Sequence, residues 1–250
     1  VSLGQAAPVA IGAYASALLV MRLNLPFLVA LLLAGVIAAV LATLVTLPIW
    51  RLGGHYVSMA TLALGYIVLS VIRGWDAVTK GAYGLSGIPA PEILGLRLLV
   101  AEDHYQLDLV VLAVTLFVVF RIRSSHLGNV LAAVGSDEIA SRSLGLRTRG
   151  YKALAYALAA FFAGMAGALL AHQYNYLDPT VFTVQMSVLV LTIVVLGGIN
   201  SPFGAVLGSL ALVGLPEALR LAPDVRILLY GIVVIAIIRF LPQGLWTRSA

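Results

Sequence analysis

Long apolar runs dominate the chain and are separated by short polar connections. A helix that crosses a hydrocarbon core needs about 20 apolar residues, and shorter stretches suit buried or re-entrant helices. One run, Leu109–Phe120, is short, and its helix can begin a few residues before Leu109. The uninterrupted runs are Ala6–Met21, Pro26–Ile49, Tyr56–Ile72, Leu109–Phe120, Tyr151–Ala171 and Ile227–Leu241. This pattern predicts an all-α, polytopic transmembrane helical bundle.

One apolar region is interrupted. Val184–Leu196 and Phe203–Leu215 are each short for a span, and Gly197-Gly198-Ile199-Asn200-Ser201-Pro202 joins them. Non-helical backbone at membrane depth survives when it is buried in protein or lines a cavity. Short segments interrupted by Gly and Pro are typical of transport pathways. We predict a broken or re-entrant helix pair; the alternative is a tight loop between two short helices at the membrane surface.

The composition supports a membrane protein. In 250 residues, 62% are hydrophobic and 10% are charged, whereas an ordinary soluble domain is about 25% charged. A soluble enzyme, a disordered chain and a coiled coil are therefore excluded. Cysteine is absent, which excludes a disulfide framework, a thiolate metal site and a Cys nucleophile. The net charge of +5 is concentrated in particular connections, which indicates membrane orientation rather than nucleic-acid binding.

The distribution of charge predicts which connections face the cytoplasm. The connection 121–150 carries five arginines against Asp137 and Glu138, whereas the connection 73–108 carries three basic and five acidic residues. The positive-inside rule places the first in the cytoplasm and the second outside. We expect a single transmembrane domain over 1–250. Because Val1 is not an initiator methionine, we also expect further spans upstream.

A short helix is predicted inside the cytoplasmic connection. Ser136 suits its N-cap, with Asp137 and Glu138 in the first turn, where the helix dipole favours acids. Gly145 suits the position just past its C-terminus. One side of this helix carries Ile139, Ala140, Ser143 and Leu144. Either this side packs on the protein's own spans, or it docks in a groove of a cytoplasmic partner.

The outer stretch Thr79–Pro91 is dense in turn-forming residues. It is either a plain surface loop or a compact lid or docking surface, with Tyr83, Gly84, Leu85 and Ser86 as the docking candidates. Its glycines are too scattered to cradle a phosphate, and no Gly-Lys-Ser/Thr occurs in the chain. The chain therefore carries no ATPase motif of its own.

Few side chains suggest chemistry. The acids around Glu102 and Asp108 lie in a predicted aqueous loop, and solvation explains them better than a metal does. His55 and His172 fall at predicted span ends, where interfacial placement explains them. No predicted span interior holds a charge, apart from Arg239 near an end. Ion-driven carriers usually need ionisable groups at membrane depth, so the energy comes from elsewhere or the protein is a passive channel.

Small residues recur in the run Tyr151–Ala171. They form overlapping small-xxx-small patterns, which allow helices to approach closely where lipid gives no hydrophobic drive to pack. The residues are Ala160, Ala163, Gly164, Gly167 and Ala168.

Four stretches in order along the chain resemble the permease subunits of Liv-type branched-chain amino-acid ABC importers. The resemblance is greatest to the M-type of the two permeases that usually pair. The stretches are Ser2–Ala7 with Ile11–Tyr14, Gly81–Pro89, Asp137–Ala140 with Ser143–Gly145, and Val195–Gly198 with Gly204.

The resemblance implies a permease in a bacterial-type inner membrane, surrounded by lipid and paired with a sister permease. Two cytoplasmic ATPase subunits would bind ATP and Mg, and a periplasmic binding protein would deliver the substrate. No cofactor in this chain and no nucleic acid are implied. The helix around Glu138 and Ala140 resembles the coupling element that docks in an ATPase groove, with Gly145 at its matching glycine.

The resemblance also implies transport by alternating access. The region of Gln5 and the broken pair are the candidate translocation path, with Gln185, Gly197, Gly198 and Asn200. Branched-chain, hydrophobic amino acids are the expected substrate. Urea or short amides are the alternative, because urea permeases share the fold and motifs. A stand-alone channel or facilitator is a further alternative, although it has no use for a docking helix.

Overall fold

A computed structural model describes residues 2–51, 55–93, 96–98, 100–199 and 201–214. The predicted span Ile227–Leu241 and the path candidate Asn200 lie outside the described residues. The chain divides into two compact units, Val1–Met186 and Ser187–Ala250, and each is described by itself.

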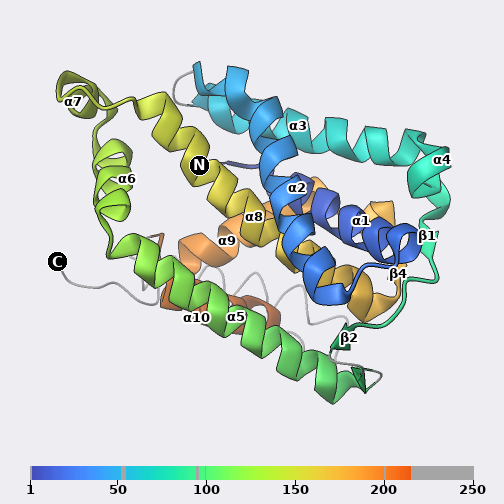
Figure 1. Cartoon of the computed structure of the whole chain (residues 1–250). Coiled ribbons are helices and arrows are strands. Elements are labelled where there is room, and N and C mark those ends of the chain that lie inside the picture. The colour runs from blue at the N-terminus through green and yellow to red at the C-terminus, as the bar shows by residue number, and fades with distance from the viewer. Residues whose placement is uncertain (1, 52–54, 94–95, 99, 200, 215–250) are drawn as a thin grey trace, which may run out of the picture. The chain divides into compact units, whose positions relative to one another are not determined.

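Among the described residues of the first unit, five helices are long and apolar enough to cross a membrane (Figure 1). They are α1 (Ala6–Leu23), α2 (Phe27–Thr46, extended by the 3-10 turn Leu47–Arg51), α3 (His55–Gly74), α5 (Ala101–Arg123) and α8 (Thr148–Tyr174). Shorter helices lie between them: α4 (Asp76–Thr79), a 3-10 turn (Gly81–Tyr83), α6 (His126–Ser136), α7 (Glu138–Ser143) and, after α8, a 3-10 turn (Pro179–Val181). The predicted all-α membrane bundle is confirmed.

Helix α5 begins further upstream than its apolar core suggested. It starts at Ala101, so that the last part of the predicted outer connection 73–108 is helical. Glu102 and Asp103 occupy the first turn, where negative side chains interact favourably with the helix dipole. The polar residues 101–108, which the sequence placed in a loop, therefore form the N-terminal turns of α5.

Helices α1, α2 and α8 pack at very short range through small residues. A Cβ added to Gly12 of α1 would lie 2.2 Å from the carbonyl oxygen of Gly164 in α8, and one added to Gly167 would lie 2.0 Å from that of Val9. On α2, Ala34 and Ala38 are fully buried against the same region. The small-residue pattern of the sequence therefore marks the contact faces that bring these three helices together.

Two short antiparallel strand pairs complete the first unit. Strand β1 (Leu85–Ser86) pairs with β4 (Tyr176–Leu177), which follows α8, and β2 (Glu92–Ile93) pairs with β3 (Leu96–Arg97). Leu85 lies opposite Leu177, and both are buried in one apolar cluster with residues of α1. The outer stretch after α4 is thus folded compactly against the end of α8.

The interrupted apolar region forms two helices. Helix α9 (Val184–Gly197) and the pair of α10 (Pro202–Ser209) with the π-helical Leu210–Gly214 meet at a bend of 118°. Ser201 caps α10 by accepting a hydrogen bond from the Gly204 N–H at 3.0 Å. A Cβ on Gly197 would lie 2.0 Å from the Gly204 carbonyl oxygen. The prediction of a broken helix pair is confirmed.

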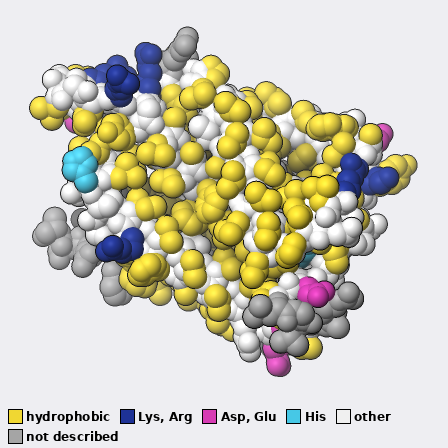
Figure 2. Space-filling model, viewed as in Figure 1, with side chains coloured by type: hydrophobic (Ala, Val, Ile, Leu, Met, Phe, Trp, Pro, Cys, Tyr) yellow, Lys and Arg dark blue, Asp and Glu magenta, His cyan; other side chains and the backbone are white. Residues whose placement is uncertain are grey.

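The surface of the described chain is largely apolar, and most of the described side chains visible in Figure 2 are hydrophobic. On α2 the exposed positions are branched aliphatic residues, among them Leu28, Leu32, Val36 and Leu44. A soluble protein rarely exposes such continuous apolar area. The exposed faces therefore match a lipid environment.

Candidate functional site

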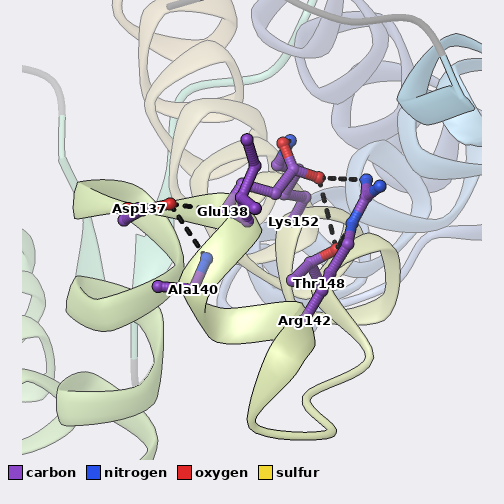
Figure 3. A network of polar contacts seen from close by, with 7 residues as sticks. Asp137, Glu138, Ala140, Arg142, Thr148 and Lys152 are labelled. Carbon is purple, nitrogen blue, oxygen red and sulfur yellow. Dashed lines mark hydrogen bonds and ion pairs between the residues drawn. The ribbon is translucent and has the colours of Figure 1, made fainter.

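Helix α7 begins at an N-cap that its own sequence supplies. The Asp137 carboxylate Oδ1 accepts hydrogen bonds from the backbone N–H groups of Ile139 (2.8 Å) and Ala140 (3.0 Å) (Figure 3). Our prediction of Ser136 as the N-cap is wrong. Ser136 is the last residue of α6, and its hydroxyl donates back to the Ala133 carbonyl at 2.9 Å. Asp137 has the extended backbone, φ −146° and ψ 106°, that an N-cap requires.

Helix α7 ends at Ser143 with Leu144 as its C-cap, and Gly145 lies just past this end, as predicted. Gly145 has φ +81°, a left-handed conformation that glycine adopts without steric cost. Its N–H donates to the Arg142 carbonyl at 2.9 Å, and the Leu146 N–H donates to the Ser141 carbonyl at 3.1 Å. This pair of bonds is the Schellman motif, which satisfies the last carbonyls of a helix. Both ends of the six-residue helix are thus fixed by local hydrogen bonds.

The side chain of Glu138 fastens α7 to α8 (Figure 3). Its Oε1 accepts from Arg142 Nη2 at 2.5 Å and from the Thr148 hydroxyl at 3.2 Å, and its Oε2 pairs with the Lys152 ammonium. Arg142 Nε also donates to the Thr148 hydroxyl, at 3.1 Å. The bond from Lys152 is the main cause that lowers the pKa of Glu138, with Arg142 acting in the same direction and burial opposing both.

The opposite side of α7 is exposed. Ile139 and Leu144 are 79% and 81% exposed, and Ala140, Ser143 and Gly145 are exposed as well. Ser141, on the inner side, is buried. Of the two alternatives from the sequence, packing of the apolar side on the protein's own spans is not what the described residues show. We call Ile139, Ala140, Ser143, Leu144 and Gly145 the α7 face.

A cavity lies directly beyond the C-terminal end of the α7 face. Its volume is about 400 Å³, and it opens between the loop after α7 and the first turns of α8. The lining residues are Gly145, Leu146, Arg147, Gly150, Tyr151 and Leu154. A protruding apolar helix next to a hollow suits a partner whose surface has the complementary groove and ridge.

The four outer docking candidates divide into two pairs. Tyr83 is 89% exposed and Ser86 is exposed, so both are accessible to a partner. Gly84 and Leu85 are buried, and we correct their assignment as direct contacts. Gly84 has φ +75°, and a Cβ there would lie 2.4 Å from the Leu177 carbonyl oxygen. Gly84 and Leu85 therefore stabilise the fold of the outer stretch and do not form part of its exposed surface.

His172 is a buried residue whose contacts the sequence did not predict. It lies in the last turn of α8, at the predicted span end, and is 0% exposed. Its Nε2 lies 3.0 Å from the Ser16 hydroxyl of α1, and its Nδ1 lies 2.8 Å from the Pro89 carbonyl of the outer stretch. Its ring also meets Phe27 of α2 edge-on. Ser16 and Pro89 are 156 and 83 residues away, so no local sequence signal announces this contact.

The candidate path residues occupy different settings. Gln5, at the N-cap position of α1, is half-buried and makes no capping bond with its side chain, and Gln185 is exposed and accepts from the Thr183 hydroxyl. Both belong to the first unit. Gly197 and Gly198 belong to the second and are buried. Gly197 approaches Gly204 closely, so the packing of α9 against α10 explains why position 197 is a glycine.

Comparison with known proteins gives a family. Residues 1–238 match the family described as "Branched-chain amino acid transport system / permease component". The chain is 34% identical to the high-affinity branched-chain amino acid transport system permease protein LivM of Escherichia coli K12, over 97% of this chain and 63% of LivM. It thus spans less than two thirds of that relative's length.

Shorter similarities extend to other permease proteins. The chain is 33% identical to the permease protein LivH of Escherichia coli K12, over 56% of this chain and 44% of LivH. It is 32% identical to the permease protein BraD of Pseudomonas aeruginosa, over 56% of this chain and 45% of BraD. No solved structure matches the chain significantly. The family match over nearly all of the chain shows that it belongs to the permease components of branched-chain amino acid transport systems.

Proposed function

We propose that this chain is part of a permease subunit that moves branched-chain amino acids across a bacterial-type inner membrane, driven by ATP. Family membership and the membrane bundle support a permease. The observation that carries the ATP-driven form is the α7 face: Ile139 and Leu144 are exposed while the Glu138 network holds the helix in place. A channel has no use for such a face.

The proposed partners follow from this arrangement. The α7 face enters a groove on one of two cytoplasmic ATPase subunits, which bind ATP and Mg. A sister permease completes the membrane part. The relatives LivM and LivH support this pairing, since both names give a permease protein of the high-affinity branched-chain amino acid transport system in one organism. A periplasmic binding protein docks on the outer stretch, where Tyr83 and Ser86 are accessible.

The proposed cycle is alternating access. The partners bind the outward-open and inward-open states with different affinities, and this difference supplies the drive. Closing of the ATPase dimer moves α7, and Glu138 passes the movement to Thr148 and Lys152 of α8. An apolar amino acid needs few polar contacts on its way, because selectivity can reside in the binding protein. Gln5, Gln185, Gly198 and Asn200 remain the proposed path residues.

A pull-down tests the proposal. The full-length tagged protein is purified from its native cell in mild detergent, and the accompanying proteins are identified by mass spectrometry. A stoichiometric ATPase and a second permease are expected. Uptake of radiolabelled leucine and of urea by the reconstituted complex then decides the substrate. A homo-oligomer without an ATPase overturns the proposal in favour of a channel or facilitator.

A further inference from the structure

Helix α8 is bonded through side chains at both of its ends. It contains 27 residues, a length of about 40 Å at 1.5 Å per residue. Near its N-terminus, Thr148 and Lys152 bind Glu138 of α7. In its last turn, His172 binds the Pro89 carbonyl of the outer stretch. One continuous helix therefore touches the α7 element and the outer stretch directly.

The hydrogen bonds at the outer end are specific. A carbonyl oxygen only accepts, so the proton of the imidazole must be on Nδ1, which donates to Pro89 at 2.8 Å. Nε2 then accepts from the Ser16 hydroxyl at 3.0 Å. Asn175, the C-cap of α8, accepts a hydrogen bond from the Ile88 N–H at its backbone carbonyl (3.3 Å), and its side-chain amide lies against the carbonyls of Ile88 and His172. The outer stretch is thus held at two consecutive residues, and by the pairing of β1 with β4 as well.

The body of α8 is suited to move as one piece. Its sequence has no proline, which removes the commonest cause of a kink. Gly164 and Gly167 bring it against the backbones of α1 and α2, and Ala160, Ala168 and Ala171 are at most 1% exposed. Close-packed interiors have low compressibility and transmit displacement. A displacement at one end of α8 therefore reaches the other end.

We propose that α8 is a rigid connection between the α7 face and the outer docking stretch, with His172 as the positioning residue at its outer end. This inference rests on the proposed function, because the α7 face must meet an ATPase for the connection to carry a signal. Binding free energies are reciprocal between coupled sites. Nucleotide bound to the ATPase should therefore change the affinity of the outer stretch for the binding protein. A bound binding protein should change the affinity of the ATPase for nucleotide by the same factor.

The test follows the outer stretch while the nucleotide state is changed. Cysteine is absent from residues 1–250, and Ser86 is exposed on β1, so Ser86→Cys introduces a reporter thiol there, and the same complex without this substitution gives the background labelling. The full-length protein is purified with its ATPase, and maleimide labelling is timed with and without a non-hydrolysable ATP analogue. We expect the labelling rate to change by about fivefold, at the lower end of ordinary allosteric coupling.

Three substitutions of His172 separate positioning from mere folding. The Asn amide nitrogen stands as many bonds from Cα as Nδ1 does, so His172→Asn can still donate to Pro89. The Gln amide nitrogen corresponds to Nε2 instead, and Leu has no donor. We expect the nucleotide-dependent change in labelling to survive in His172→Asn and to be lost in His172→Gln and His172→Leu. Ser16→Ala leaves the hydrogen bond between His172 and Pro89 in place, so the nucleotide-dependent change in labelling should survive in this variant as well.

The possible outcomes are distinct. Failure of an ATPase to co-purify with the unsubstituted protein contradicts the proposed function itself. With the ATPase present, an unchanged labelling rate in the Ser86→Cys protein overturns the rigid connection. A full nucleotide response in both His172→Gln and His172→Leu also overturns it. A loss of the response in His172→Asn, together with its loss in the other two variants, overturns it too. If His172→Leu does not reach the membrane, His172→Gln against His172→Asn still decides the question.

Discussion

The Glu138 carboxylate of α7 and the Lys152 ammonium of α8 form an ion pair across 14 residues of chain. The second partner, Arg142, lies four residues from Glu138 on the same helix, and such a pair adds little beyond local helix stability. The pair with Lys152 is different because it joins two elements. It holds α7 so that Ile139 and Leu144 point away from the protein's own helices.

Reversing the charge of Glu138 should therefore uncouple transport. Glu138→Arg places a third cation beside Arg142 and Lys152 and removes both the ion pair with Lys152 and the hydrogen bond from Thr148 that hold α7 on α8. We expect uptake to fall about tenfold or more, while the amount of protein in the membrane stays normal because α7 lies outside the spans. Uptake in vesicles and quantitative immunoblotting measure both quantities. Normal uptake in this variant would contradict the assignment of α7 as the coupling element.

A charge exchange provides the matched control. Glu138→Lys combined with Lys152→Glu recreates an ion pair of opposite orientation between the same two positions. We expect it to recover part of the uptake lost in either single variant, since a coupling energy between two contacting residues shows as non-additivity. Strictly additive losses would mean that the pair is not what positions α7.

The α7 face should be needed for the ATPase and not for folding. Leu144 is 81% exposed, so Leu144→Asp removes no internal packing, yet it would bury an unpaired charge at an interface, at a cost of several kcal/mol. We expect co-purification of the ATPase to be lost with unchanged membrane levels. Ala132→Asp, at an exposed position of the neighbouring α6, is the control and should co-purify normally. Equal loss in both variants would remove the specific role of the face.

The sequence was sufficient for features whose signals are local, and insufficient where distant residues decide. Gly145 marks the end of α7 because a left-handed residue is needed there. The N-cap was misplaced by one residue, since Ser136 and Asp137 are both good caps and only the backbone conformation distinguishes them. The contacts of His172 were not predicted, because they depend on Ser16 and Pro89, which lie far away in the sequence and which the fold brings to it.

The corrected N-cap can be tested directly. Asp137→Ala removes the acceptor for the Ile139 and Ala140 N–H groups, which should destabilise α7 by about 1 kcal/mol. Ser136→Ala should change the stability of α7 by far less, as its hydroxyl bonds only back into α6. Hydrogen exchange of the α7 amides measures the difference. A larger effect from Ser136→Ala would restore the original assignment.

The glycine contacts between α8 and its neighbours predict a strong size limit. A Cβ at Gly164 would lie 2.5 Å from the Ala38 Cβ and 3.0 Å from the Ala34 carbonyl oxygen. Gly164→Leu should therefore cost at least about 1–3 kcal/mol through overpacking, and a charged residue there should lower membrane levels further. Gly65 of α3 has nothing within 4 Å of an added Cβ, so Gly65→Leu is the matched control. Thermal stability in detergent should fall only for Gly164→Leu; equal tolerance at both sites would contradict the close packing.

The docking of α7 on α8 should weaken in acid. The bond from Lys152, aided by Arg142, lowers the pKa of Glu138 below its ordinary value. A carboxyl group with a lowered folded-state pKa contributes stability that is complete above its unfolded pKa and is lost as the pH falls through its folded pKa. We expect the protection of α7 amides from hydrogen exchange, normalised to unstructured peptides, to be constant near neutral pH and to fall below about pH 4.5. In Glu138→Gln this contribution is missing at every pH, so the two proteins should differ most at neutral pH and converge in acid. A constant difference across the range would show that ionised Glu138 does not hold the helix.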